Sequence, residues 1–398
     1  LAYEGQVFTQ CYVASPDNLE NRAALQTGRH PTRLNLATNG SPIIEPEFPT
    51  VGQLLHATGY KTGYIGKWAL GVPGHFSVPE RKGYEEWLGL LQPRECVEQF
   101  PLTVFRNDPV NKFNGEAPLV FNRDGKRGMY LHDVFTKAAT NFVRIYHPYK
   151  YNKFQPFFLT VSFTLPNPVD FEPAPTNTFN AVPSTMPFTG EKWPAAEKQK
   201  AAAIVRLDRS VGTLMQVLET YRQHTNTVVF FTSDGGPFKG RGVTPKFLQS
   251  AGPFKGAKGD LEEGGLRVPL IVRWPGFIPS GRTNDLVCSQ MDLLSTSLEF
   301  GKTANPKGVD GISFRPLLIH DKQTNRHSFL HWETRDAVAI RKGDYKGTRK
   351  MATNDWTVEE VDTQLARQIA ALKSNRPTAK QFEAIWDSLG KAAAPIRE

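Results

Sequence analysis

Cysteine and histidine are the side chains that most often bind transition metals, and their spacing in this 398-residue chain predicts no metal site. The three cysteines, Cys11, Cys96 and Cys288, lie far apart, and none belongs to a CxxC pair. The nine histidines show no paired ligand spacing either. The spacing therefore argues against a structural zinc site and a disulfide framework, and the odd number of cysteines favours reduced thiols.

The overall charge is basic, with 48 Lys and Arg against 39 Asp and Glu and a net charge of +9. Such a chain can attract acidic partners, but its basic residues are dispersed, so we expect no nucleic-acid binding. No apolar run approaches the ~18–20 residues of a membrane span, and we expect no transmembrane segment. The sequence begins at Leu1 without a signal peptide, so either a leader was removed or part of the original N-terminus is absent.

Segments with strand-like and helix-like patterns alternate along most of the chain, as in α/β proteins. Apolar residues at helical spacing predict helices over 51–58 and 195–222, the second through Ile204, Leu207, Val211, Met215 and Leu218. Short apolar runs predict strands over residues 62–67, 157–163, 228–231 and 268–273. The run 157–163 (FFLTVSF) is continuous, which is typical of a strand buried on both faces. We therefore expect a large, mostly parallel sheet with helices on both faces.

Two regions interrupt this alternation. Residues 71–130 and 169–194 are rich in Pro, Gly or Asn, and we expect them to be loops outside the sheet. After about residue 319 the pattern changes: 331–346 predicts small antiparallel strands and 358–391 a charged helix. We place an α/β domain at 1–319 and a small C-terminal subdomain, with an antiparallel sheet and a terminal helix, at 320–398.

Several segments follow one another in an order that resembles one enzyme family. They are EGQVF (4–8), NRAALQTGRHP (21–31), GKWALG (66–71), FFLTVSFTLPNP (157–168), FTSDGGP (231–237), the stretch 252–276 and the stretch 285–318. In this order they resemble the sulfatases of the alkaline-phosphatase superfamily, especially the arylsulfatase type. The resemblance implies the large sulfatase sheet and the hydrolysis of sulfate esters.

The nucleophile that the resemblance implies is missing. Sulfatases use a Cys or Ser that is oxidised to formylglycine, four positions before an arginine that corresponds to Arg22. That position is Asn18 here, and an amide cannot become an aldehyde hydrate. Cys11 and Ser15 lie nearby, but at the wrong spacing from Arg22.

The metal site that the resemblance implies is also incomplete. Sulfatases hold Ca²⁺ with an Asp-Asp pair from their first strand and with the Asp-Asn of an SDNG motif. The present sequence begins after that strand, and of the second motif Asp234 is retained whereas Gly235 replaces the asparagine. A hard cation takes several oxygen ligands, so we expect neither calcium nor formylglycine as a cofactor.

Of the remaining positions that the resemblance implies, some keep the family residue and others do not. Arg22, Lys67 and Lys258 match the arginine and lysines that bind the sulfate, whereas Ala69 and Asn167 replace two histidines, and with them the leaving-group acid. The three cations could still bind sulfate or phosphate. Alternatively, they pair with nearby carboxylates such as Asp17, Glu20 or Glu262.

The leading hypothesis is a catalytically inactive sulfatase-like protein that serves as a structural or accessory subunit of a larger complex. The basic charge and the few cysteines are compatible with an organellar matrix such as that of mitochondria. The alternatives are an active sulfuric-ester hydrolase with an altered site, for which Ser15 is a candidate nucleophile, and a module that binds anions or sulfated glycans.

Three possibilities account for the family's first, central strand, which the present sequence does not contain. The residues lie upstream of Leu1, the sheet has rearranged, or a strand of another polypeptide fills the place.

Overall fold

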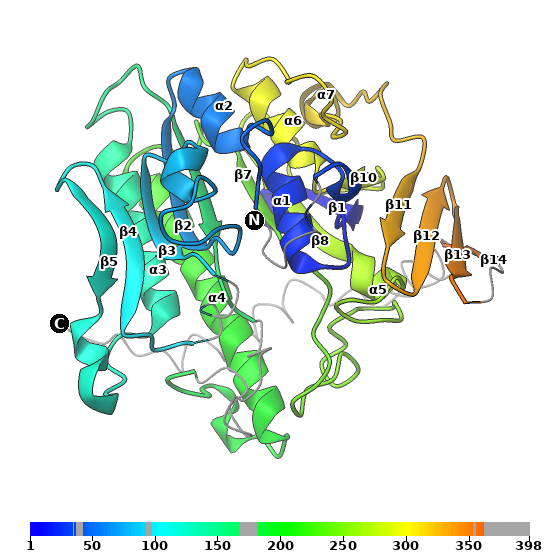
Figure 1. Cartoon of the computed structure of the whole chain (residues 1–398), viewed down its shortest axis with the longest axis horizontal. Helices are drawn as coiled ribbons and strands as arrows, with labels where there is room; N and C mark the ends of the chain where they lie inside the picture. Colours follow the sequence, from blue (N-terminus) through cyan, green and yellow to red (C-terminus); the bar gives the residue numbers. More distant parts are fainter. Residues whose placement is uncertain are drawn as a thin grey trace.

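The computed structural model describes residues 1–34, 36, 43–92, 95, 98–166, 182–352 and 356–361. It is built from two five-stranded sheets, helices on their faces and a small four-stranded sheet at one end (Figure 1). The α/β class and the small C-terminal antiparallel sheet are thus confirmed. The helices are α1 (Asn18–Thr27), α2 (Val51–Ala57), α3 (Leu131–Tyr146), α4 (Ala195–Thr220), α5 (Glu263–Leu266), α6 (Asp292–Phe300) and α7 (Arg315–His320).

The first large sheet has the strand order β5-β4-β3-β2-β6. Strands β3, β2 and β6 are parallel, and β4 and β5 are added to β3 as an antiparallel hairpin. The bounds are β2 (Lys61–Lys67), β3 (Glu86–Leu90), β4 (Thr103–Asp108), β5 (Phe113–Pro118) and β6 (Phe157–Ser162). The expectation that 71–130 lies outside the sheet is therefore wrong for β3, β4 and β5. Strand β5 is mostly exposed and β3 and β4 are only partly buried, so their apolar alternation is weak in sequence.

The second large sheet has the order β10-β1-β8-β7, with β9 also beside β1. Strand β8 is antiparallel to both β1 and β7, whereas β9 and β10 are parallel to β1. The sheet is therefore mixed, and not mostly parallel as expected. The bounds are β1 (Gly5–Tyr12), β7 (Val229–Thr232), β8 (Arg267–Arg273), β9 (Arg282–Asn284) and β10 (Cys288–Ser289).

The two large sheets do not pair with each other among the described strands. Strand β6 is an edge strand of the first sheet and pairs with β2, and β7 is an edge strand of the second sheet and pairs with β8. Every residue of β6 and β7 is only partly buried, although both strands are rich in Phe, Leu and Val. The prediction of a strand at 157–163 is confirmed, but its burial on both faces is not, because each of its six residues is only partly buried.

The helices form layers over the sheets (Figure 1). Helix α3 packs Leu131, Phe135 and Ala139 against Ile65 of β2, and α4 lies along α3. Helices α2 and α6 pack together through Val51, Leu55, Leu294 and Leu298. The predicted helices at 51–58 and 195–222 correspond to α2 and α4.

The C-terminal sheet has the order β11-β12-β13-β14 and lies beside the second large sheet (Figure 1). Trp332 joins it to that core, since its indole donates to the backbone oxygen of Val13 at 2.7 Å. Of the helix expected over 358–391, residues 358–360 lie in β14 and residues 362–398 lie outside the described residues. The bounds are β11 (Leu330–Glu333), β12 (Ala337–Lys342), β13 (Tyr345–Lys350) and β14 (Trp356–Glu360).

Two further expectations concern the chain as a whole. Cys11 and Cys288 are free and buried, and they are partners in the register between β1 and β10. No helix among the described residues has the length and apolar character that crossing a membrane requires.

Candidate functional site

Helix α1 carries the first group of predicted site residues. Asp17 begins the helix by accepting hydrogen bonds from the backbone N–H groups of Leu19 and Glu20, which satisfies two otherwise unpaired donors. Gly28 ends it with a φ of 65°, a left-handed conformation that glycine adopts without strain. Between these caps, Asn18 and Arg22 are four residues apart and therefore project from the same face.

Arg22 joins the ends of the two large sheets. Its guanidinium donates to the backbone oxygens of Lys67 and Trp68, where β2 ends, and to the Tyr64 hydroxyl at 2.7 Å. It also forms an ion pair with Asp234, just after β7, at 3.1 Å. The carboxyl ends of β2 and β7 therefore meet at one side chain, so the two strands run in the same direction toward the site.

Asp234 is held in its ionised form by the cations around it. Burial alone would raise the pKa of this carboxyl, but the charges of Lys67, Arg22 and Lys258 outweigh burial and lower the pKa below its ordinary value. About a third of the side chain stays exposed. The structure thus brings together four predicted residues, and the partner of Arg22 is Asp234. Two carboxylates expected as alternative partners of the cations have other roles. Asp17 caps α1, and Glu20 accepts a hydrogen bond from the Ser15 hydroxyl at 2.7 Å.

Asn18 and Gly235 fill one space between them. The Asn18 amide nitrogen lies 3.5 Å from an oxygen of Asp234, and its oxygen Oδ1 is buried without a hydrogen-bond partner. A Cβ built on Gly235 would lie 2.6 Å from that oxygen. The asparagine at position 18 therefore occupies volume that a side chain at position 235 would need.

Lys67 and Ala69 lie at the end of β2, positioned by a close strand contact. Gly66 has a φ of 114°, and a Cβ there would lie 2.0 Å from the backbone oxygen of Ser162 in β6. Only glycine allows this approach. Ala69 is fully buried with a φ of 59°, so it presents no polar group to the site.

The other candidates are distributed as follows. Lys258 is half-buried and contributes to the charge around Asp234. Ser15 is buried against Glu20, and Cys11 lies inside the second sheet, so neither is presented as a nucleophile beside Asp234. Asn167 lies outside the described residues.

Two amide side chains that the sequence did not single out complete the site. Asn21 donates to the backbone oxygen of Asp234 at 3.1 Å and to the Gln290 oxygen at 2.5 Å. Gln290 in turn donates to the Thr232 hydroxyl and the Ser233 backbone oxygen. These bonds fix the turn after β7 relative to α1. Asn21 and Gln290 are 269 positions apart, so no local pattern could have paired them.

These residues do not fit a calcium ion. Calcium takes six to eight oxygen ligands. Near Asp234, the described side chains offer one carboxylate and the amide oxygen of Asn18, and three cationic side chains oppose a bound cation. Nowhere in the described part of the chain do three or more His, Cys, Asp or Glu side chains form a group that could hold a metal.

A cleft of about 1120 Å³ extends from this site between the two sheets. Strands β6 and β7 form its sides, α4 lines one face, and α2 and α6 line the other. Most of its lining is apolar. The apolar residues whose spacing predicted α4 all line this cleft: Ile204, Leu207, Val211, Met215 and Leu218.

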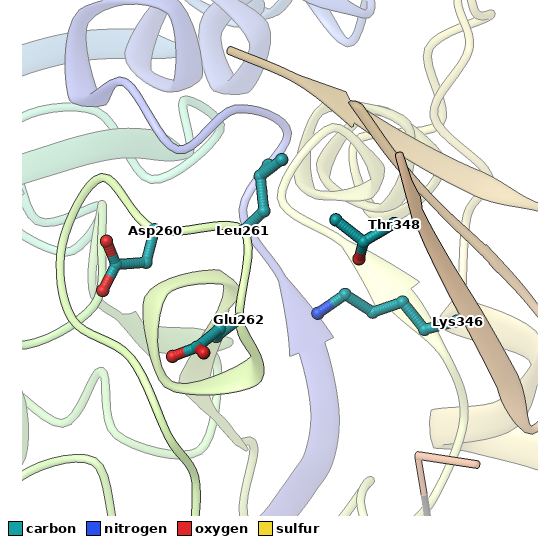
Figure 2. A pocket seen from close by; sticks show the side chains of 5 residues that line it. All are labelled: Asp260, Leu261, Glu262, Lys346 and Thr348. Atoms are coloured by element: carbon teal, nitrogen blue, oxygen red, sulfur yellow. The ribbon is translucent and has the colours of Figure 1, made fainter. Parts of the chain in front are cut away.

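A smaller pocket of about 300 Å³ lies elsewhere, between the loop 260–262 and β13 (Figure 2). In Figure 2 the Lys346 side chain extends from β13 toward that loop. Its ammonium forms an ion pair with Glu263 at 3.1 Å, so its charge serves to hold the C-terminal sheet in place. This pocket shares no lining residue with the site around Asp234.

Comparison with known proteins identifies the relationship. The family described as "Sulfatase" matches residues 1–302, and "N-sulphoglucosamine sulphohydrolase, C-terminal" matches residues 258–367. N-acetylgalactosamine-6-sulfatase of Canis lupus familiaris is 30% identical over 378 residues, covering 89% of this chain and 67% of that protein. Arylsulfatase A of Bos taurus is 28% identical over 411 residues, covering 97% and 75%.

Solved structures agree in fold. Ps i-CgsB superposes with a TM-score of 0.74 at 24% identity, covering 98% of this chain and 85% of that one. The PsFucS1 sulfatase from Pseudoalteromonas sp. superposes with a TM-score of 0.65 at 25% identity, covering 91% and 75%.

Proposed function

The chain belongs to the sulfatase family, and we propose that it is a non-hydrolysing member that serves as an accessory or structural subunit of a larger assembly. The observation that carries the proposal is the pair Asn18 and Gly235. An amide stands where the resemblance places the nucleophile, and it fills the space beside Asp234 that a second ligand at position 235 would need. The retained scaffold supports a role that needs the fold but not the reaction.

Hydrolysis of a chromogenic aryl sulfate tests this proposal. We expect the purified protein to release no more product than buffer, with or without millimolar calcium, and the Asp234→Ala variant to behave identically. Calcium-dependent release that disappears in Asp234→Ala would support the active alternative, a sulfuric-ester hydrolase with an altered site, and would overturn the proposal.

Binding of an anion is a second candidate function, favoured by Arg22, Lys67 and Lys258 around one carboxylate. Sulfate is the simplest ligand of that chemistry, and sulfated sugars are a larger one. Isothermal titration with sulfate should show saturable binding that weakens in Lys67→Met. Absence of saturation at millimolar sulfate would exclude this function.

The assembly and the compartment remain predictions. The names of the relatives give no support to the mitochondrial matrix. Native mass spectrometry of material from the natural source would report bound subunits directly, and a free monomer of about the mass of this chain would contradict the subunit role.

A further inference from the structure

The loop between α3 and β6, residues 147–156, presents aromatic rings and lysines to solvent. Phe154 is 82% exposed, and Tyr149 is 75% exposed. The aromatic and basic residues alternate along the loop, and the exposed ones are Tyr149, Lys150, Tyr151, Lys153 and Phe154. Single exposed apolar residues are common on protein surfaces, but a group of exposed rings edged by polar residues marks an interaction surface.

Contacts within the loop hold it in one shape. The His147 ring stacks on the Tyr221 ring, with 4.7 Å between their centroids. The Asn152 side chain accepts a hydrogen bond from the Phe154 backbone N–H at 3.1 Å, which closes a turn. The outward positions of Tyr149 and Phe154 are therefore fixed by ordered neighbours.

The turn between β4 and β5, residues 109–112, lies at the same end of the first sheet. Strand β6 is parallel to β2, so the loop 147–156 lies where β2 begins. Strand β3 is also parallel to β2, and β4 is antiparallel to β3, so β4 ends where β2 begins. Consistent with this arrangement, burial and the carboxylates of Glu86 and Asp108 raise the pKa of Tyr146, whose ring lies 5.0 Å from that of Tyr151.

The two segments together carry a positive charge. The turn adds Val110, which is 66% exposed, and the exposed Lys112. Residues 109–112 and 147–156 contain three lysines and no Asp or Glu. The nearby Asp108 pairs with Arg106, so its charge is compensated within the sheet. We call the following exposed residues the loop patch: Val110, Lys112, Tyr149, Lys150, Lys153 and Phe154.

The chemistry of the loop patch fits an anionic lipid surface. Val110 and Phe154 have no hydrogen-bonding group in their side chains, so they gain from transfer into an apolar phase. A tyrosine ring suits the headgroup level of a bilayer, where its hydroxyl stays hydrated. The lysines attract anionic headgroups, and their stems can lie along apolar surface. The patch lines neither the cleft beside Asp234 nor the pocket of Figure 2, and a flat partner needs no cavity.

From these observations we infer that the loop patch docks the protein on the surface of a bilayer that contains anionic lipid. Phe154 and Val110 enter the apolar boundary, and the three lysines contact the headgroups. Arg22 lies at the carboxyl end of β2, so the site around Asp234 faces away from the bilayer. This inference goes beyond the proposed function and holds whether or not the chain hydrolyses sulfate esters.

Cosedimentation of the full chain with vesicles tests the inference. The probe is large unilamellar vesicles of phosphatidylcholine with about 30% phosphatidylserine. We expect the protein to partition onto them about tenfold more strongly than onto pure phosphatidylcholine, and the difference to shrink as salt is added. Absence of binding to the anionic vesicles at low salt would overturn the inference.

Paired variants separate the charges of the patch from its rings. Lys150→Gln/Lys153→Gln should lower the partition coefficient about tenfold, because each lysine near an anionic surface contributes to binding. Tyr149→Ser/Phe154→Ser should lower it by about the same factor, because the rings lose their apolar contact. The matched controls are exposed residues elsewhere, and both should bind as the unchanged protein does: Lys322→Gln/Lys342→Gln and Tyr3→Ser/Phe329→Ser.

A conservative variant reports insertion directly. Phe154→Trp should keep vesicle binding, and its emission, after subtraction of the unchanged protein's spectrum, should shift to shorter wavelength when anionic vesicles are added. An unshifted emission, or equal binding by Tyr149→Ser/Phe154→Ser and the unchanged protein, would show a purely electrostatic contact and overturn the inference. Binding to dextran sulfate that needs the same rings, without binding to vesicles, would assign the patch to a sulfated polysaccharide and would overturn it as well.

Discussion

At the scale of single residues, the site around Asp234 combines retained charges with altered neighbours. The charges of Arg22, Lys67 and Lys258 keep the Asp234 carboxyl ionised. The Asn18 side chain occupies the space that a side chain at position 235 would need. The changed pair Asn18 and Gly235 and the retained charge of Arg22 each have a local physical consequence that can be measured directly.

Substitution of Gly235 by asparagine should destabilise the chain by about 1 kcal/mol, because its Cβ would lie 2.6 Å from the Asn18 oxygen and that side chain must move. The free energy of unfolding in urea measures the effect. The double variant Asn18→Gly/Gly235→Asn should recover most of the loss. Equal losses in the single and double variants would show that the two positions do not share this space.

Removal of the Arg22 charge should raise the pKa of Asp234, because the remaining cations offset burial less completely. Carboxyl-carbon NMR titration of Arg22→Met measures this pKa. Because the pKa of Asp234 in the folded protein lies below its ordinary value near 3.8, the ionised carboxylate stabilises the fold at pH values above 3.8. This stabilisation is lost as the pH falls through the pKa of the folded state. Arg33→Met is the control, since Arg33 pairs with Asp310 instead, at 3.2 Å. An unchanged Asp234 pKa in Arg22→Met would contradict the ion pair.

At the scale of the elements, the close approach of β2 and β6 depends on Gly66. Gly66→Ala should cost roughly 3 kcal/mol of unfolding free energy, because the φ of 114° and the Ser162 oxygen at 2.0 Å leave no room for a methyl group. Gly74→Ala is the matched control. Its φ of 79° is also positive, but nothing lies within 4 Å of its Cβ, so we expect about 1 kcal/mol. Similar losses in both variants would show that backbone strain alone matters at Gly66.

The start of α6 is tied to the segment before β11 by a histidine. His327 lies 2.8 Å from Asp292; burial lowers the pKa of His327, but the charges of Asp292 and Asp310 outweigh burial and raise it. A raised pKa contributes stability below the unfolded value near 6.5, and this contribution is lost as pH rises through the folded value. The free energy of unfolding should therefore fall as the pH rises from about 6.5 through the folded-state pKa of His327. In His327→Gln, the free energy of unfolding should depend less on pH over the same range. An identical slope in the variant would contradict this pairing.

At the scale of the whole molecule, the open cleft should bind an apolar dye. Strands β6 and β7 and helix α4 present partly exposed apolar residues to a cleft of about 1120 Å³. We expect anilinonaphthalene sulfonate to fluoresce when it is mixed with the native protein, because apolar side chains line the cleft. Native fluorescence no higher than that of free dye would show that the cleft is closed in solution.

The sequence predicts much of this architecture and misses identifiable parts of it. Runs of apolar residues locate β2, β6, β7, β8 and α4, because burial requires periodic apolar residues whatever covers them. The same patterns cannot say what covers them, so β6 was expected to be buried on both faces and instead lines the cleft. The bonds of Asn21 and Gln290 join distant segments and have no sequence signature.

The contacts of α1 also have a mechanical consequence. Arg22 holds the end of β2, while Asn21 holds the turn after β7, and the described strands of the two sheets do not hydrogen-bond to each other. Helix α1 therefore links the carboxyl ends of the two sheets, and the packing of α2 against α6 is a second link between them. Under a force that pulls the two sheets apart, we expect the α1 side-chain bonds and the α2–α6 contact to break before either sheet loses a strand.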